Sequence, residues 1–134
     1  MAIVNLRRIL LVALGGTIGT AGRLALGLLL PEHGGFPIAV LLANIVGAFL
    51  IGVLAARPFG RLGDAAAAEV RLLLGTGMLG GFTTYSSFMT GTLALWADAP
   101  VVAAAYALGS LVLGLGAAAL GLRLGRPRSA GGAA

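Results

Sequence analysis

The chain has no cysteine and no lysine, and only 10% of its residues are charged. Without cysteine, neither a disulfide framework nor a thiolate metal site is possible. A soluble domain carries about 25% charged residues, so this composition excludes a fully solvated surface. A pI near 11.5 is compatible with nucleic-acid binding, but the arginines form no dense run and punctuate apolar segments instead. We therefore expect no nucleic-acid partner, and a protein integrated in a membrane.

Carboxylates and histidine are scarce as well. The four acidic residues and the single histidine all lie near the end of an apolar run or in a connection: Glu32, Asp64, Glu69, Asp98 and His33. A proton-coupled cation exporter needs a buried carboxylate, and an intramembrane protease needs a Ser–His pair or two aspartates. A transition-metal site needs ligands that the apolar runs lack. These classes are disfavoured, and we expect a protein that is not an enzyme.

Four long apolar runs are what the sequence does contain. The chain is 59% hydrophobic, with a mean hydropathy of +1.05. A hydrocarbon core about 30 Å thick requires roughly 20 helical residues, and each run reaches that length. We expect an all-α membrane protein that forms a single domain over residues 1–134. Its four transmembrane helices are expected at residues 9–30, 36–56, 70–96 and 100–124.

Glycine is abundant, at 23 residues. The pairs Gly15–Gly19 and Gly121–Gly125 have the GxxxG spacing that lets helix backbones approach closely in lipid. Four thin helices enclose little volume, so a polar path through the protein would require a second copy or a partner.

The polar groups inside the runs donate hydrogen bonds or carry positive charge. They are Arg23, Asn44, Tyr106, Ser110 and the hydroxyls of residues 83–90. A lining of donors without carboxylates suits an anion. The alternative is that these groups join helices to one another, as Ser, Thr and Asn commonly do in membranes. This inventory alone favours anion passage only slightly.

The segment GGFTTYSSFMT, residues 80–90, interrupts an apolar run with glycines and hydroxyls. Glycine costs about 1 kcal/mol in a helix interior relative to alanine, so we predict a break near Gly80–Thr83. Broken backbone at membrane depth requires protein or a cavity to satisfy its carbonyls, and freed carbonyls suit a hard cation such as Na⁺. Beyond the break, Tyr85 and Phe88 share one helical face, as lining or as packing.

GGFTTYSSF, residues 80–88, resembles the third-helix signature GGxTTFSTF of the small bacterial fluoride channels called Fluc or CrcB. Their first-helix pattern GGxxGAxxR is similar to residues 15–23, and their N-x-x-G-x-F pattern is similar to residues 44–49. A tyrosine and a serine four residues apart on their fourth helix resemble Tyr106 and Ser110. The resemblance covers all four runs in order, from about residue 10 to 124.

The resemblance implies an antiparallel dimer with two narrow fluoride pores lined by both subunits. A Na⁺ ion at the dimer axis would be held by the backbone carbonyls of Gly80 and Thr83. Tyr85 and Phe88 match the pore-facing aromatic residues, and Arg23 matches a vestibule or packing arginine, with snorkelling to the interface as its alternative role. The donors to a dehydrating fluoride would be Asn44, Ser86, Ser87, Tyr106 and Ser110.

Three departures from the family pattern concern individual residues. Tyr85 replaces a phenylalanine, and Met89-Thr90-Gly91 replaces the usual S-x-E, which removes a vestibule carboxylate. Thr20 and Leu24 replace the usual alanine and aromatic residue around the arginine. The function implied is passive export of F⁻ across the bacterial inner membrane, which relieves fluoride toxicity. The alternatives are an anion exchanger, a small dual-topology exporter, or a structural subunit with no conduction of its own.

Arginine placement predicts the orientation of the chain. With four spans, both termini and the 57–71 connection share one side, which holds eight arginines: Arg7, Arg8, Arg57, Arg61, Arg71, Arg123, Arg126 and Arg128. The opposite loops hold neither arginine nor lysine. This bias favours both termini in the cytoplasm. It also favours a heterodimer with an oppositely biased homologue over a homodimer of one chain that inserts both ways.

Overall fold

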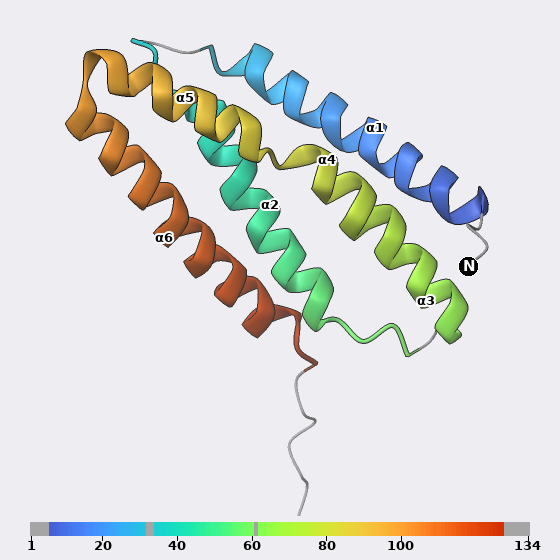
Figure 1. The fold of residues 1–134 in the computed structure, drawn as a ribbon. Helices are drawn as coiled ribbons and strands as arrows, with labels where there is room; N and C mark the ends of the chain where they lie inside the picture. Colours follow the sequence, from blue (N-terminus) through green and yellow to red (C-terminus); the bar gives the residue numbers. More distant parts are fainter. Residues whose placement is uncertain (1–5, 32–33, 61, 128–134) are drawn as a thin grey trace, which may run out of the picture.

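A computed structural model of the chain describes residues 6–31, 34–60 and 62–127, and all regular secondary structure within them is helical. Three helices are long and apolar enough to cross a membrane: α1 (Leu6–Leu29), α2 (Ile38–Ala56) and α6 (Pro100–Gly125) (Figure 1). They begin and end within three residues of the first, second and fourth expected spans. The predicted all-helical class and these three spans are confirmed.

The remaining expected span, residues 70–96, is divided into shorter helices. The helices over this region are α3 (Asp64–Val70), the π-helical stretch η1 (Arg71–Leu79), α4 (Gly80–Phe82) and α5 (Tyr85–Asp98), and together they extend beyond both ends of the expected span. The longest of these, α5, has 14 residues. Between α4 and α5 the backbone is extended, with ψ of 155° at Thr83 and 119° at Thr84. The predicted break is present, and it falls at Thr83–Thr84.

The glycine pair does not cause this break. Gly80 has helical dihedrals, φ −63° and ψ −37°, and Gly81 continues α4. A Cβ atom on Gly81 would lie 2.5 Å from the carbonyl oxygen of Gly16, closer than real Cβ contacts come. The break therefore lies at the threonines that follow the glycines, and Gly81 serves close packing of α4 on α1.

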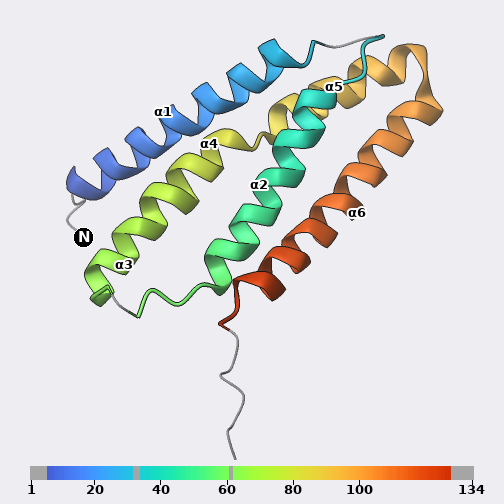
Figure 2. The ribbon, with the colours of Figure 1, turned by 180° about the vertical axis from the view of Figure 1, so that it is seen from behind.

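The helices pack in two groups that the broken segment connects. α1 packs on η1 and α4, whereas α2 packs on α6 and α5 also packs on α6 (Figures 1 and 2). Both GxxxG pairs lie at backbone contacts. A Cβ atom on Gly19 would overlap the carbonyl of Met78, and one on Gly121 would overlap the carbonyl of Phe49. The predicted close packing of these glycines is confirmed.

Few side chains are buried. The core cluster comprises Phe88 and Leu95 of α5 with Ala103 and Tyr106 of α6. Large apolar side chains on α1 and α6 are mostly exposed; Leu28, for example, is 76% exposed. An outer surface of this kind suits contact with lipid or with a second subunit.

The start of α1, the connection between α2 and α3, and the end of α6 lie at the same end of the molecule (Figure 1). That end, called here the arginine end, carries Arg7, Arg8, Arg57, Arg71, Arg123 and Arg126. Four other residues of the charge argument, Glu32, His33, Arg61 and Arg128, lie outside the described residues.

Candidate functional site

Asn44 of α2 holds the break in the helix. Its side-chain Nδ2 donates to the carbonyl of Thr84 over 3.1 Å, and its Oδ1 accepts from the Thr84 backbone N–H over 2.8 Å. One amide side chain thus replaces both hydrogen bonds that an extended residue cannot make inside a helix. Because backbone groups in an apolar setting require partners, Asn44 makes this break possible.

Two backbone carbonyls at the break lack their usual helical donors, because those N–H groups bond elsewhere. In an α-helix each N–H bonds to the carbonyl four residues earlier. The Thr84 N–H would bond to Gly80, but it donates to Asn44. The Ser87 N–H would bond to Thr83, but it donates to the Thr84 Oγ1 over 3.2 Å as an N-cap. The carbonyls of Gly80 and Thr83 therefore both lack their usual intrahelical donor.

A third carbonyl near the break is bound by side chains of α1. The Gly81 carbonyl accepts from the Arg23 Nε at 3.3 Å and from the Thr20 Oγ1 at 3.4 Å. Arg23 is partly buried and contacts α4 just before the break. Thr20, one of the two residues around this arginine that depart from the family pattern, thus adds a second donor to the same carbonyl.

A cavity of about 300 Å³ lies beside the break, between α2, α5 and α6. Its lining comprises Asn44, Ala48, Ile51, Thr83, Thr84, Tyr85, Phe88, Ser110 and Leu111. The structure thus brings together the expected site residues Asn44, Thr83, Tyr85, Phe88 and Ser110. We call this space the break cavity. No carboxylate is among the described residues that line it.

Four aromatic rings form a row that leads away from the break cavity. The ring centroids of Tyr85 and Phe88 are 6.1 Å apart, and those of Phe88 and Tyr106 are 5.6 Å apart. Phe36 meets Tyr106 edge-on, with centroids at 5.4 Å. Tyr85 is 75% exposed and Phe88 only 8%. One ring of the expected pair therefore lies at the surface of the single chain, and the other lies in its core.

Three expected donors do not line the break cavity. The hydroxyls of Ser86 and Ser87 are hydrogen-bonded with the Thr84 Oγ1 at 3.2 and 3.1 Å. Tyr106 lines a neighbouring cavity of about 330 Å³ together with Ser110. The Ser110 hydroxyl donates to the Tyr106 carbonyl over 2.6 Å. The expected donors are therefore spread along the break and the aromatic row.

Sequence reasoning missed part of this site. Ala48, Ile51 and Leu111 line the break cavity, but aliphatic residues occur throughout an apolar chain and carry no distinguishing signal. Phe36 was expected only as the start of a span, and no local pattern connects it with Tyr106, seventy residues later in the sequence. Thr84 was noted as a hydroxyl, whereas its backbone is what Asn44 binds.

The apolar spanning helices and the broken segment with its donor- and ring-lined cavity define a small polytopic membrane protein. Residues 10–122 match the family described as CrcB-like protein, Camphor Resistance (CrcB). The chain therefore belongs to the Fluc/CrcB family, as its motifs predicted.

Three similar proteins all carry the name "Fluoride-specific ion channel FluC". The one from Thermus thermophilus is 47% identical over 123 residues, which cover 90% of this chain and 96% of the relative. The one from Oceanobacillus iheyensis is 41% identical over 120 residues, covering 89% and 92% respectively. The one from Paracoccus denitrificans is 44% identical over 117 residues, covering 86% and 91%.

Proposed function

We propose that the chain is a fluoride channel that lets F⁻ leave the cytoplasm passively. The observation that carries this proposal is the meeting of Asn44, Tyr85, Phe88 and Ser110 in the break cavity, in a chain whose relatives are named fluoride-specific ion channels. Fluoride enters cells as neutral HF and ionises in a less acidic cytoplasm. An anion pathway releases it down its gradient and relieves toxicity.

The chemistry of the break cavity suits a small anion. The Asn44 amide has a second N–H besides the one given to Thr84, and the Ser110 hydroxyl would donate to an anion by rotating away from the Tyr106 carbonyl. The positive edges of aromatic rings face anions favourably. The absence of a carboxylate from the lining removes the main repulsion. Arg23 of α1 adds positive charge outside the break cavity, where it donates to the carbonyl of Gly81 in α4. Ser86, Ser87 and Tyr106 are proposed donors further along the path.

The proposed architecture is a single four-span domain that works as an antiparallel dimer in the bacterial inner membrane. α3, η1, α4 and α5 would together form the fourth, interrupted crossing. A single chain leaves Tyr85 75% exposed, and an inverted second subunit would cover that ring and complete the pore. The partner would be an identical copy or an oppositely oriented homologue.

Na⁺ is the proposed structural cation at the dimer axis. The carbonyls of Gly80 and Thr83 fit it, because the donors that would close their helical bonds are diverted to Asn44 and Thr84. Carbonyl oxygens are hard ligands that suit such an ion. When bound, the ion would supply positive charge at the break, and the residues around it would keep the broken backbone in place.

Ion efflux from liposomes that contain only this protein tests the function. We expect F⁻ to be released readily and Cl⁻ to be retained, without any counter-anion outside. A strict need for a counter-anion would indicate an exchanger, and a need for a cationic drug substrate would indicate an exporter. Absence of any flux from correctly assembled protein would indicate a structural subunit. Equal fluoride and chloride efflux would overturn the selectivity proposed here.

A further inference from the structure

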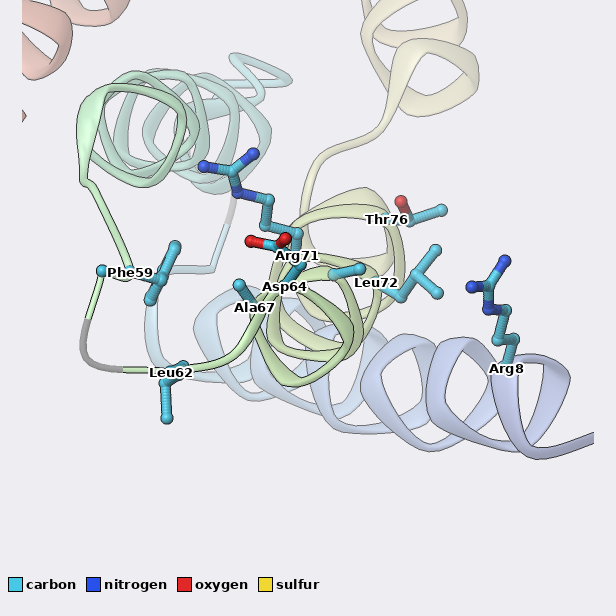
Figure 3. Close-up of a pocket in the computed structure, with 10 residues that line it drawn as sticks. Arg8, Phe59, Leu62, Asp64, Ala67, Arg71, Leu72 and Thr76 are labelled. Atoms are coloured by element: carbon cyan, nitrogen blue, oxygen red, sulfur yellow. The ribbon is translucent and has the colours of Figure 1, made fainter.

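A larger cavity lies at the arginine end, on elements that do not form the break cavity. It measures about 590 Å³ and is bordered by α1, the connection before α3, α3 itself and η1 (Figure 3). Its lining residues are Arg8, Phe59, Gly60, Leu62, Asp64, Ala67, Ala68, Arg71, Leu72 and Thr76. None of them lines the break cavity, so the two spaces are separate.

Two arginines give this cavity a positive balance. Arg8 rises from α1 on the side of Leu72 and Thr76, whereas Arg71 lies on the side of the α2–α3 connection (Figure 3). The guanidinium carbon of Arg71 is 5.5 Å from the ring centroid of Phe59, a cation–π contact that favours this position. Asp64 is the one acidic residue of the lining. Among the described residues of the lining, two arginines against one aspartate leave one net positive charge.

The neighbouring ion pair leaves Arg8 to this cavity. Arg7, next to it on α1, bonds to Glu69 over 2.7 Å and is not among the lining residues. Arg7 therefore already forms an ion pair with Glu69, the carboxylate of α3 that does not line the cavity. Arg8 and Arg71 are the cations available to a ligand in the cavity, and Thr76 adds a hydroxyl beside them.

An apolar groove continues from this cavity along α1 and η1. It measures about 460 Å³ and is lined by Arg8, Ile9, Val12, Ala13 and Leu72. Arg8 and Leu72 belong to both spaces. A cationic cavity joined to an aliphatic groove has the shape and polarity of an anionic amphiphile.

We propose that these two spaces bind one anionic phospholipid. Its phosphate would lie in the cavity bordered by Arg8 and Arg71, and an acyl chain would lie on Ile9, Val12 and Ala13. Basic pockets between transmembrane helices on the cytoplasmic side bind anionic headgroups in this way, and the arginine bias favours a cytoplasmic position for this end. The lipid would join α1 to the α2–α3 connection. This proposal does not depend on fluoride conduction.

Native mass spectrometry of the purified full chain tests it, with phosphatidylglycerol and phosphatidylcholine of identical acyl chains as probes. We expect one phosphatidylglycerol to bind about fivefold more tightly than phosphatidylcholine, since each arginine contributes roughly fivefold near an anionic headgroup and Asp64 offsets one of the two. The double variant Arg8→Gln/Arg71→Gln should lose that preference. The control Arg123→Gln/Arg126→Gln removes the same charge from the same end, outside the cavity, and should keep it.

Two further arms separate a lipid from a soluble anion and from general surface charge. Glycerol phosphate should compete weakly, and Ala13→Phe, which fills the groove, should weaken phosphatidylglycerol binding several-fold. Glycerol phosphate that binds as tightly as phosphatidylglycerol would overturn the lipid assignment. Equal loss in the control and cavity variants would do the same, as would equal affinity of the unaltered chain for the two lipids. Size-exclusion chromatography and thermal unfolding of the variants in detergent report their folding.

Discussion

The Asn44 side chain hydrogen-bonds to both the N–H and the carbonyl of Thr84. Replacing Asn44 tests what these two bonds contribute. Asn44→Ala would leave the N–H and carbonyl of Thr84 unpaired, and each unsatisfied buried group costs about 1–3 kcal/mol. We expect both the thermal stability in detergent and fluoride efflux to fall. Loss of efflux at unchanged stability would show that Asn44 acts on fluoride alone and does not hold the break.

Asn44→Asp is the matched change for the same residue. An aspartate can still accept from the Thr84 N–H, but it cannot donate to the Thr84 carbonyl, and it places a negative charge in the break cavity. We expect stability between that of the unaltered chain and that of Asn44→Ala. Fluoride efflux should be at least as low as in Asn44→Ala, because the charge repels the anion. Efflux close to that of the unaltered chain would show that fluoride does not pass this side chain.

Phe88 is both a core residue and a lining residue, so its test needs a control for packing. Phe88→Ile removes the polarised ring edge from the break cavity and should lower fluoride efflux more than tenfold while the protein still assembles. Leu95→Val changes the same buried cluster away from the cavity and should leave efflux nearly unchanged. If both variants lose efflux equally, Phe88 acts through packing alone.

Tyr85 differs from the family pattern by one hydroxyl group. The ring is 75% exposed in the single chain, with its centroid 6.1 Å from that of Phe88. Tyr85→Phe keeps the ring and restores the usual residue, so fluoride efflux should change less than about twofold. A large loss of efflux, measured in the same liposome assay, would show that this chain uses the hydroxyl itself.

At the scale of elements, the sequence predicted the spans well and the break only in part. Apolar length determines α1, α2 and α6, and their bounds follow from it. The break was expected from glycine, yet Gly80 and Gly81 are helical. Its position depends on Asn44, 40 residues before Thr84, and local patterns do not report such a contact. The π-helical form of η1 likewise has no signal in apolar periodicity.

Glycines at helix contacts differ from glycines that face outward, and alanine substitution separates them. A Cβ atom on Gly121 would overlap the backbone of Phe49, whereas one on Gly114 of the same helix would meet nothing within 4 Å. Gly121→Ala should lower the free energy of unfolding by about 1–3 kcal/mol. Gly114→Ala should leave it unchanged or raise it by up to about 1 kcal/mol. Thermal unfolding in detergent measures both, and equal effects would contradict the packing described.

At the scale of the whole molecule, the proposed cation joins two copies of the break. If the carbonyls of Gly80 and Thr83 hold Na⁺, replacing all Na⁺ with N-methylglucamine should abolish fluoride efflux or dissociate the dimer. Changing Thr83 to Ser should matter little, because the backbone supplies the ligand. Full efflux and an intact dimer by size-exclusion chromatography in strictly Na⁺-free buffer would contradict the site.

Chain orientation is a second property of the whole molecule. Described arginines other than Arg23 belong to one end, so the chain should insert with both termini in the cytoplasm. An antiparallel assembly would then require a homologue of opposite bias. Reporter fusions at the C-terminus in the native host should label one membrane face. Comparable labelling of both faces would instead support a dual-topology homodimer.

Glycines at close helix contacts also affect the side-chain conformational entropy that is lost when the helices pack together. These glycines are Gly15, Gly19, Gly81 and Gly121. These contacts join backbone to backbone, and glycine has no side-chain rotamers to lose when a helix docks. Leucines exposed on α1, such as Leu28 at 76% exposure, keep more rotameric freedom in the folded chain than buried side chains do. The helices therefore associate at a low cost in side-chain conformational entropy, while the flexible side chains remain on the outer surface.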